Sequence, residues 1–387
     1  MRSLLKRSNT SLLREIDQLR SVLLRHSISQ ELASYYVWVL AENDSLRRQA
    51  LQNLRDLSLN RDDTLDDILS QTQNLTRRFR LYDERLTTPV LRSLPSDRLC
   101  LRIVNWLHSL HSQTSHIPTG LSDGEFSIWP EPQLPAVYFM PPSAQLGLLY
   151  LPLFFHEFGH LLYAYHKPEM DDLVRDLQEK IAELLQPLSQ RDDFHTQEQA
   201  KKRNVIVETW YEWTQELFCD AVGFVIGGPA FIKAFSMFFL MSGQGRFTLP
   251  SDQLEQSQHP VTWLRIRLLA ERSRHLGLMD EAKRLEDDWD TTARTMSISE
   301  DYYGFFEDDF RPFIQKTVND MLTEASPYHF TKDDVASCEW DPQTSTPVHL
   351  LNRAWAVFAA DPNCYDDWER QAVQTFLESN NDCDVPA

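Results

Sequence analysis

The stretch LPLFFHEFGHLLYAYH at 151–166 contains two histidines spaced four residues apart, His156 and His160. On a helix, side chains at this spacing project from one face, which is the geometry that two ligands of a tetrahedral Zn²⁺ require. Glu157 follows the first histidine, close enough to touch a metal-bound water without binding the metal itself. The pattern is HExxH, which is typical of metal-dependent hydrolases. The alternative is that His156 and His160 are ordinary histidines of a core helix.

A third ligand is expected from the stretch VETWYEWTQELFCDAVGF at 207–224. It carries carboxylates at i+4 steps along one helical stripe: Glu208, Glu212, Glu216 and Asp220. Such a stripe is usually solvated, but this one runs into the most apolar segment of the chain, where a carboxylate must be paired or metal-bound. We therefore predict Glu216 as the third ligand, with Glu212 as the alternative. Asp220 is expected to accept the spare N–H of a ligating histidine.

A third motif is QHPVTWLRIRLL at 258–269. His259 precedes Pro260 at an expected helix start, and Arg265 follows nearly two turns later. By itself, this His-Pro pair could simply cap the start of a helix.

Together, HEFGH, ELFCD at 216–220 and His259-Pro260 with Arg265-Ile266 resemble the gluzincin metallopeptidases. The likeness is greatest to the branch with CAAX prenyl proteases and HtpX-like peptidases, whose motifs run HExxH, ExxAD and HPxxxxRI. Cys219 stands where that branch has alanine. The resemblance covers about residues 145–275. The membrane spans of the branch are not evident here, so its prenylated substrates and membrane setting are not carried over.

The resemblance implies a zincin-like core that binds one zinc ion per chain and hydrolyses peptide bonds. It implies that zinc activates a water molecule and that Glu157 acts as general base. His259 or Arg265 would bind the oxyanion or position Asp220. The implied zinc ligands are His156, His160 and Glu216. Three alternatives share many of these residues: a zinc hydrolase of a non-peptide amide, a zinc-containing scaffold without catalysis, and a membrane-embedded peptidase.

The elements around these motifs predict a mainly α (α+β) protein with a small β-sheet. We expect an N-terminal helical domain, arm or hairpin, at 1–112, where apolar residues recur at heptad-like spacing from Leu5 to Leu23. The metallopeptidase core is expected at 113–322, with a polar helical insertion near 167–205 and a C-terminal helical segment at 323–387. Between His111 and Pro142, turn signals (IPTG, LSDGEF) surround two strand-like runs, FSIW and AVYFM.

Residues 221–241 are long and apolar enough to suggest a membrane span. Lys233 lies inside this segment, however, and Gly227-Gly228-Pro229 interrupts it. A lysine in the middle of a bilayer costs about 3 kcal/mol. We therefore predict a broken, buried core helix and no membrane association.

Composition narrows the function classes further. Asp and Glu number 57 against 38 Lys and Arg, a net charge of −19. Such a surface repels phosphate backbones, so nucleic acid is not expected as a partner. The five cysteines include no CxxC pair, and the first twenty residues have no apolar signal-peptide core. Both features favour a reducing, cytoplasmic setting.

The charge is unevenly distributed. Residues 1–110 carry 17 basic against 13 acidic side chains, whereas the remainder carries 21 against 44. The N-terminal domain could therefore bind a protein partner, although a solvated helical face is the commoner explanation. The other expected partner is a peptide or protein substrate.

Overall fold

The structure is a computed structural model that describes residues 1–59, 65–114, 117–124, 126–132, 134–141, 147–185, 193–241, 246–336 and 338–379. Helices account for 74% of the chain, far above the roughly 30–35% of an average globular protein. The described strands number three and are short. The predicted mainly α class is confirmed.

The chain forms two compact units. The first comprises Met1–His108, His116–Glu125 and Pro135–Gln145. The second comprises Ser109–Ser115, Phe126–Leu134 and Leu146–Ala387.

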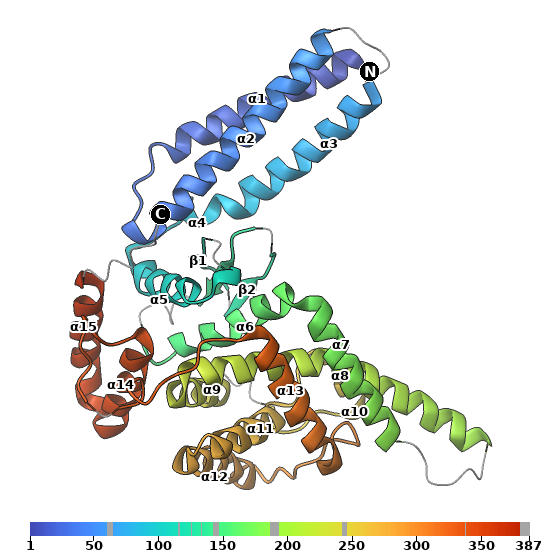
Figure 1. The fold of residues 1–387 in the computed structure, drawn as a ribbon, viewed down its shortest axis with the longest axis vertical. Coiled ribbons are helices and arrows are strands. Elements are labelled where there is room, and N and C mark those ends of the chain that lie inside the picture. Colours follow the sequence, from blue (N-terminus) through green and yellow to red (C-terminus); the bar gives the residue numbers. More distant parts are fainter. Residues whose placement is uncertain are drawn as a thin grey trace. The chain divides into compact units, whose positions relative to one another are not determined.

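The first unit is built on three long helices that pack side by side (Figure 1). They are α1 (Arg2–Leu23), α2 (Ala33–Ser58) and α3 (Leu65–Leu81), followed by the shorter α4 (Thr88–Leu91) and α5 (Arg98–Ser109). The heptad-spaced residues of α1 do pack inward, because Leu5, Leu12, Ile16 and Leu23 are buried. A third helix therefore joins the expected hairpin.

Two strands of the first unit run parallel. In β1 (Thr119–Ser122) and β3 (Val137–Met140), Thr119 lies opposite Val137. The run AVYFM is predicted to have strand character, and its residues 137–140 form β3. IPTG and LSDGEF are expected to form turns, but residues 119–122 of these stretches form the strand β1. The hydrogen bonds between β1 and β3 outweigh the local preference of these residues for turns.

The second unit holds most of the helices and the strand β2 (Ser127–Trp129), which lies in the predicted run FSIW and beside α6. Its longer helices are α6 (Phe154–Tyr165), α7 (Lys167–Leu184), α8 (Asp193–Gly227), α9 (Pro229–Met241), α11 (Thr262–His275), α12 (Met279–Thr295), α13 (Arg311–Ala325), α14 (Pro347–Ala360) and α15 (Pro362–Glu378). The four-residue α10 (Ser251–Leu254) precedes α11. The 167–205 region forms α7 and the start of α8, and α7 packs one face against α8 and α13. Residues 186–192 of this insertion lie outside the described residues.

The apolar segment 221–241 is broken, as predicted. Helix α8 ends at Gly227, Gly228 adopts a positive φ of 59°, and Pro229 starts α9. A positive φ favours glycine. Proline is well suited to the first position of a helix, because the backbone N–H that it lacks would have no partner within the helix. Most side chains on both sides of the break are buried in the unit. In the described part of the chain, no helix is both long and apolar enough to cross a membrane.

Candidate metal centre

The centre is built where helices α6 and α8 of the second unit pack tightly against each other. Gly159, inside the HEFGH motif, allows this approach. A methyl group added there would lie 2.7 Å from the Cα of Cys219 and 3.1 Å from its Sγ. The small residues Gly159 and Cys219 thus allow the histidines of α6 and the carboxylates of α8 to come together.

His156 and His160 project from α6 toward Glu216 on α8. The Nε2 atom of His156 lies 3.5 Å from Glu216 Oε2, and the Nε2 atom of His160 lies 3.5 Å from Glu216 Oε1. Among the described residues, this is the one group of three or more His, Cys, Asp or Glu whose potential ligand atoms all lie within 4.8 Å of one another. The structure therefore brings the three predicted ligands together.

The spacing of this group suits a metal ion. Tetrahedral ligand atoms about 2.0–2.1 Å from zinc lie about 3.3–3.4 Å from one another, and each histidine Nε2 lies close to this distance from one oxygen of Glu216, although the two oxygens differ. Glu216 Oε2 is also a buried carboxylate oxygen without a well-formed hydrogen bond from any described residue. Its nearest cation is the Arg265 guanidinium, whose Nη2 lies 3.3 Å away, and a metal ion at the group would be a second cation for this buried oxygen.

Asp220 lies beside His156, and Arg265 is paired with Asp220. Asp220 Oδ1 lies 2.9 Å from His156 Nδ1, the nitrogen that a metal at Nε2 leaves free. The Arg265 guanidinium donates two hydrogen bonds of 2.7 Å to Asp220, and its Nη2 lies 3.3 Å from Glu216 Oε2. The faces of Phe235 and Phe239 cover the guanidinium at 4.9 and 5.5 Å from the ring centres. Asp220 therefore lies beside the histidine nitrogen from which it is expected to accept, but no well-formed hydrogen bond joins the two in the structure.

Gln215 is a further contact that the sequence analysis missed. Its Nε2 lies 3.4 Å from His160 Nδ1, so the side-chain amide of Gln215 is beside the second histidine as Asp220 is beside the first. Either end of an amide can face an imidazole nitrogen, because one end donates and the other accepts. The sequence gives no signal for this contact, because it depends on how α8 is rotated against α6.

Glu157 is buried, with 9% of its surface exposed. Burial raises the pKa of its carboxyl to about 7, and the charges of His156, Glu216, Arg265 and Asp220 also act on it. The residue after the first histidine thus faces the same group of charges as the three candidate ligands.

Of the three candidate ligands, His156 alone is expected to hold an extra proton in the metal-free protein. Burial disfavours a charged imidazole, but the carboxylates of Asp220 and Glu216 outweigh it and raise the pKa of His156 to about 10. Burial and the charge on His156 lower the pKa of His160 to about 4. Burial opposes ionisation of Glu216, yet His156 and Arg265 hold its pKa below the usual range. A metal must displace the proton of His156 when it binds.

His259 lies at the exposed side of the centre. Its Nε2 is 3.6 Å from Glu216 Oε2, and 60% of its side chain is exposed. Helix α11 starts only at Thr262, with Val261 at its N-cap and no side-chain cap. His259 therefore does not cap that helix.

The remaining carboxylates of the α8 stripe point elsewhere. Glu208 and Glu212 are both exposed, whereas Glu216 and Asp220 are 7% and 2% exposed. The split follows the sequence, because the stripe passes from a polar stretch into an apolar one. Glu212, the alternative ligand, is not part of the group around His156.

Comparison with known proteins gives no relative. No family model matches the chain, no curated protein matches it, and no solved structure matches it.

Proposed function

We propose that this protein is a zinc-dependent metallopeptidase of the gluzincin type, with one zinc ion per chain bound by His156, His160 and Glu216. The observation that carries the proposal is the convergence of these three side chains with Glu157 buried beside them. The motif resemblance to the CAAX protease and HtpX-like branch supports it. A zincin-like core is part of the proposal, and the contact of the strand β2 with α6 is compatible with it.

A catalytic site is favoured over a structural one by the donor set. Structural zinc sites use four protein ligands, whereas catalytic sites use three and leave a position open. The described group contains three, and His259 lies at its exposed side, next to a carboxylate already in the group. A non-catalytic scaffold would also have no use for a buried carboxylate at position 157.

Each residue of the centre has its own role in the proposed reaction. Zinc, when bound, lowers the pKa of a water molecule and polarises a carbonyl group. Glu157 takes the proton of the attacking water and passes it to the leaving amine. With a metal at Nε2, Asp220 would accept the Nδ1–H of His156, and Arg265 fixes Asp220 by two hydrogen bonds. His259 donates a hydrogen bond to the carbonyl oxygen as negative charge develops on it.

The setting is part of the same proposal. A peptide or protein is the substrate, the N-terminal helices bind a protein partner, and the protein acts in the cytoplasm. The described cysteines support a reducing compartment, because Cys100, Cys219, Cys338 and Cys364 are free thiols. The strongly acidic composition argues against nucleic acid as a partner.

The test compares wild-type protein with Glu157→Gln and with Glu212→Gln, an exposed carboxylate of α8, as the matched control. Zinc content is measured by elemental mass spectrometry, and cleavage is measured on a peptide library and on non-peptide amides. We expect one zinc per chain in all three proteins. We expect a loss of peptide cleavage of about 10²-fold or more in Glu157→Gln alone.

Cleavage by Glu157→Gln within about tenfold of wild type would remove Glu157 from the role of general base. Zinc bound by all three proteins without any cleavage by the wild type would favour the scaffold. Cleavage of only the non-peptide amides would favour the other hydrolase.

A further inference from the structure

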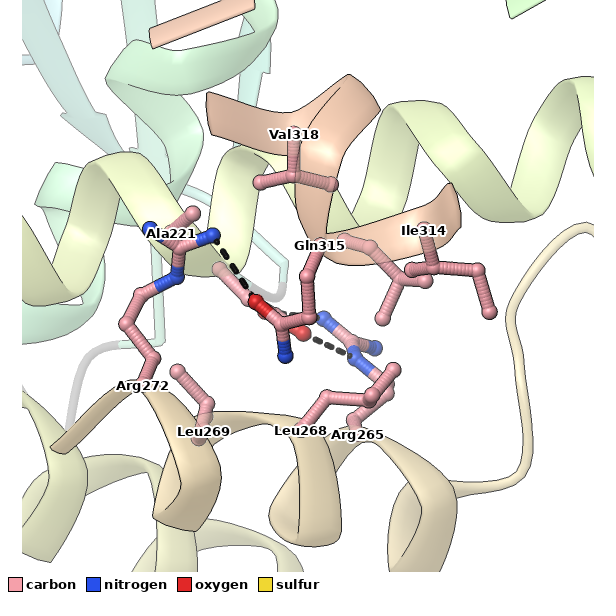
Figure 2. Close-up of a pocket in the computed structure, with 10 residues that line it drawn as sticks. Ala221, Arg265, Leu268, Leu269, Arg272, Ile314, Gln315 and Val318 are labelled. Carbon is pink, nitrogen blue, oxygen red and sulfur yellow. Dashed lines mark hydrogen bonds and ion pairs between the residues drawn. The ribbon is translucent and has the colours of Figure 1, made fainter. Parts of the chain in front are cut away.

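A small cavity lies behind the metal centre, between α8, α11 and α13 of the second unit (Figure 2). Its volume is about 20 Å³, enough for one water molecule. Apolar side chains form most of its wall. The polar lining comes from Asp220, Arg265, Arg272 and Gln315.

The two arginines at this cavity differ in their partners. Arg265 is neutralised by Asp220 and contacts Glu216. Arg272 donates to two neutral amide oxygens, Asn319 Oδ1 at 2.9 Å and Gln315 Oε1 at 3.5 Å. Figure 2 shows Arg272 and Gln315 facing each other at the cavity. Within the described ranges, no carboxylate forms an ion pair with Arg272.

The nearest candidate counter-ion is already engaged. Glu271, its neighbour on α11, binds Arg311 at 3.3 Å. Arg272 is half-buried, and loss of hydration lowers the pKa of its guanidinium to about 10, although the charge of Glu271 acts in the opposite direction. In a chain with a net charge of −19, a cation left without an acidic partner stands out.

We propose that this cavity binds a monoatomic anion, chloride in the cell, at the guanidinium of Arg272. A halide ion is about as large as the water molecule that the cavity can hold, whereas an oxyanion such as sulfate or phosphate is too large for it. The anion supplies the counter-charge that the amides of Gln315 and Asn319 cannot. It also lies next to the Asp220–Arg265 pair that holds His156.

The site is tested on the full chain without metal, so the result does not depend on the proposed peptidase function. Thermal unfolding is measured in EDTA with sodium chloride or sodium gluconate at equal ionic strength. Gluconate cannot enter the cavity. We expect the melting temperature to rise saturably with chloride, by about 2–3 °C, relative to gluconate.

Two variants address the binding residues. Arg272→Gln removes the charge and should abolish the chloride-dependent rise. Gln315→Glu places a carboxylate beside Arg272, so it should raise the melting temperature in gluconate and also abolish the chloride-dependent rise. Arg284→Gln, an exposed arginine on α12 that pairs with Glu281, is the control and should keep the wild-type response.

The proposal is overturned if wild-type protein melts at the same temperature in both salts. It is also overturned if Arg272→Gln or Gln315→Glu responds to chloride as the wild type does. Should Arg272→Gln fail to fold, Gln315→Glu decides alone, because the glutamate is nearly isosteric with the residue it replaces.

Discussion

Asp220 and Gln215 flank Glu216 on one helix, and each contacts the Nδ1 atom of a different histidine. A neutral imidazole carries one proton, so the partner of Nδ1 determines whether Nε2 is free to bind a metal. A carboxylate can only accept a hydrogen bond, so Asp220 selects the required tautomer of His156 without ambiguity. An amide can do either, so Gln215 should control His160 less strictly.

Asp220→Asn should therefore weaken zinc binding by about 10–100-fold, whereas Gln215→Leu should weaken it by less. The asparagine keeps the shape of the side chain but loses the charge that Arg265 and His156 share. Zinc affinity is measured by competition with a chelator, with Glu212→Gln as control. An unchanged affinity in Asp220→Asn would show that Asp220 only pairs with Arg265.

His259→Asn tests the exposed side of the same centre. If His259 donates to the developing oxyanion, kcat should fall by roughly 10²-fold, while zinc content, KM and melting temperature change little. Because α11 starts at Thr262, no loss of a helix cap should complicate the comparison. A kcat within about threefold of wild type would exclude His259 from catalysis.

At the scale of elements, the centre depends on how closely α6 and α8 approach. The nearest atom to a Cβ added at Gly159 is a backbone atom, Cys219 Cα at 2.7 Å, which cannot move unless the helix moves. The spacing between the histidines of α6 and the carboxylates of α8 is thus fixed by a position that holds no ligand.

Gly159→Ala should lower the free energy of unfolding by about 1–3 kcal/mol and weaken zinc binding, because the helices must separate. Helix propensity alone predicts the opposite sign, a gain of about 1 kcal/mol for alanine over glycine. Chemical denaturation and chelator competition measure the two effects. Trimming Cys219 to alanine in the same chain should restore only part of the loss, since its Cα remains. An unchanged free energy of unfolding in Gly159→Ala would show that α6 and α8 can accommodate a methyl group at position 159.

At the scale of the whole molecule, the sequence predicts the parts of the centre that are local. Helical spacing places His156 with His160, and the apolar flanks indicate that Glu216 and Asp220 are buried. Contacts that depend on the rotation of one helix against another, such as Gln215 with His160, do not follow from spacing. The strand β1 and the cavity at Arg272 escape prediction for the same reason. They exist because elements distant in sequence pack together.

The C-terminal helices show this dependence across the second unit. The side chain of Asn352 on α14 donates to Gly227 O at 3.1 Å and accepts from Ala230 N at 2.9 Å. These are backbone groups at the break between α8 and α9, which the interrupted helix cannot pair internally. A residue more than 120 positions away thus completes the end of the helix that carries Glu216 and Asp220.

Asn352→Ala should accordingly lower the free energy of unfolding by about 1–3 kcal/mol, because it leaves backbone groups at the break without partners. Chemical denaturation measures the change, with Gln371→Ala, an exposed residue of α15, as the control that should be silent. Zinc binding should weaken as well, since Asp220 lies two turns before the break. If Asn352→Ala were as stable as the control, the hydrogen bonds of Asn352 would contribute nothing to the stability of the junction between α8 and α9. The C-terminal helices would then be a separable addition to the metal-binding helices.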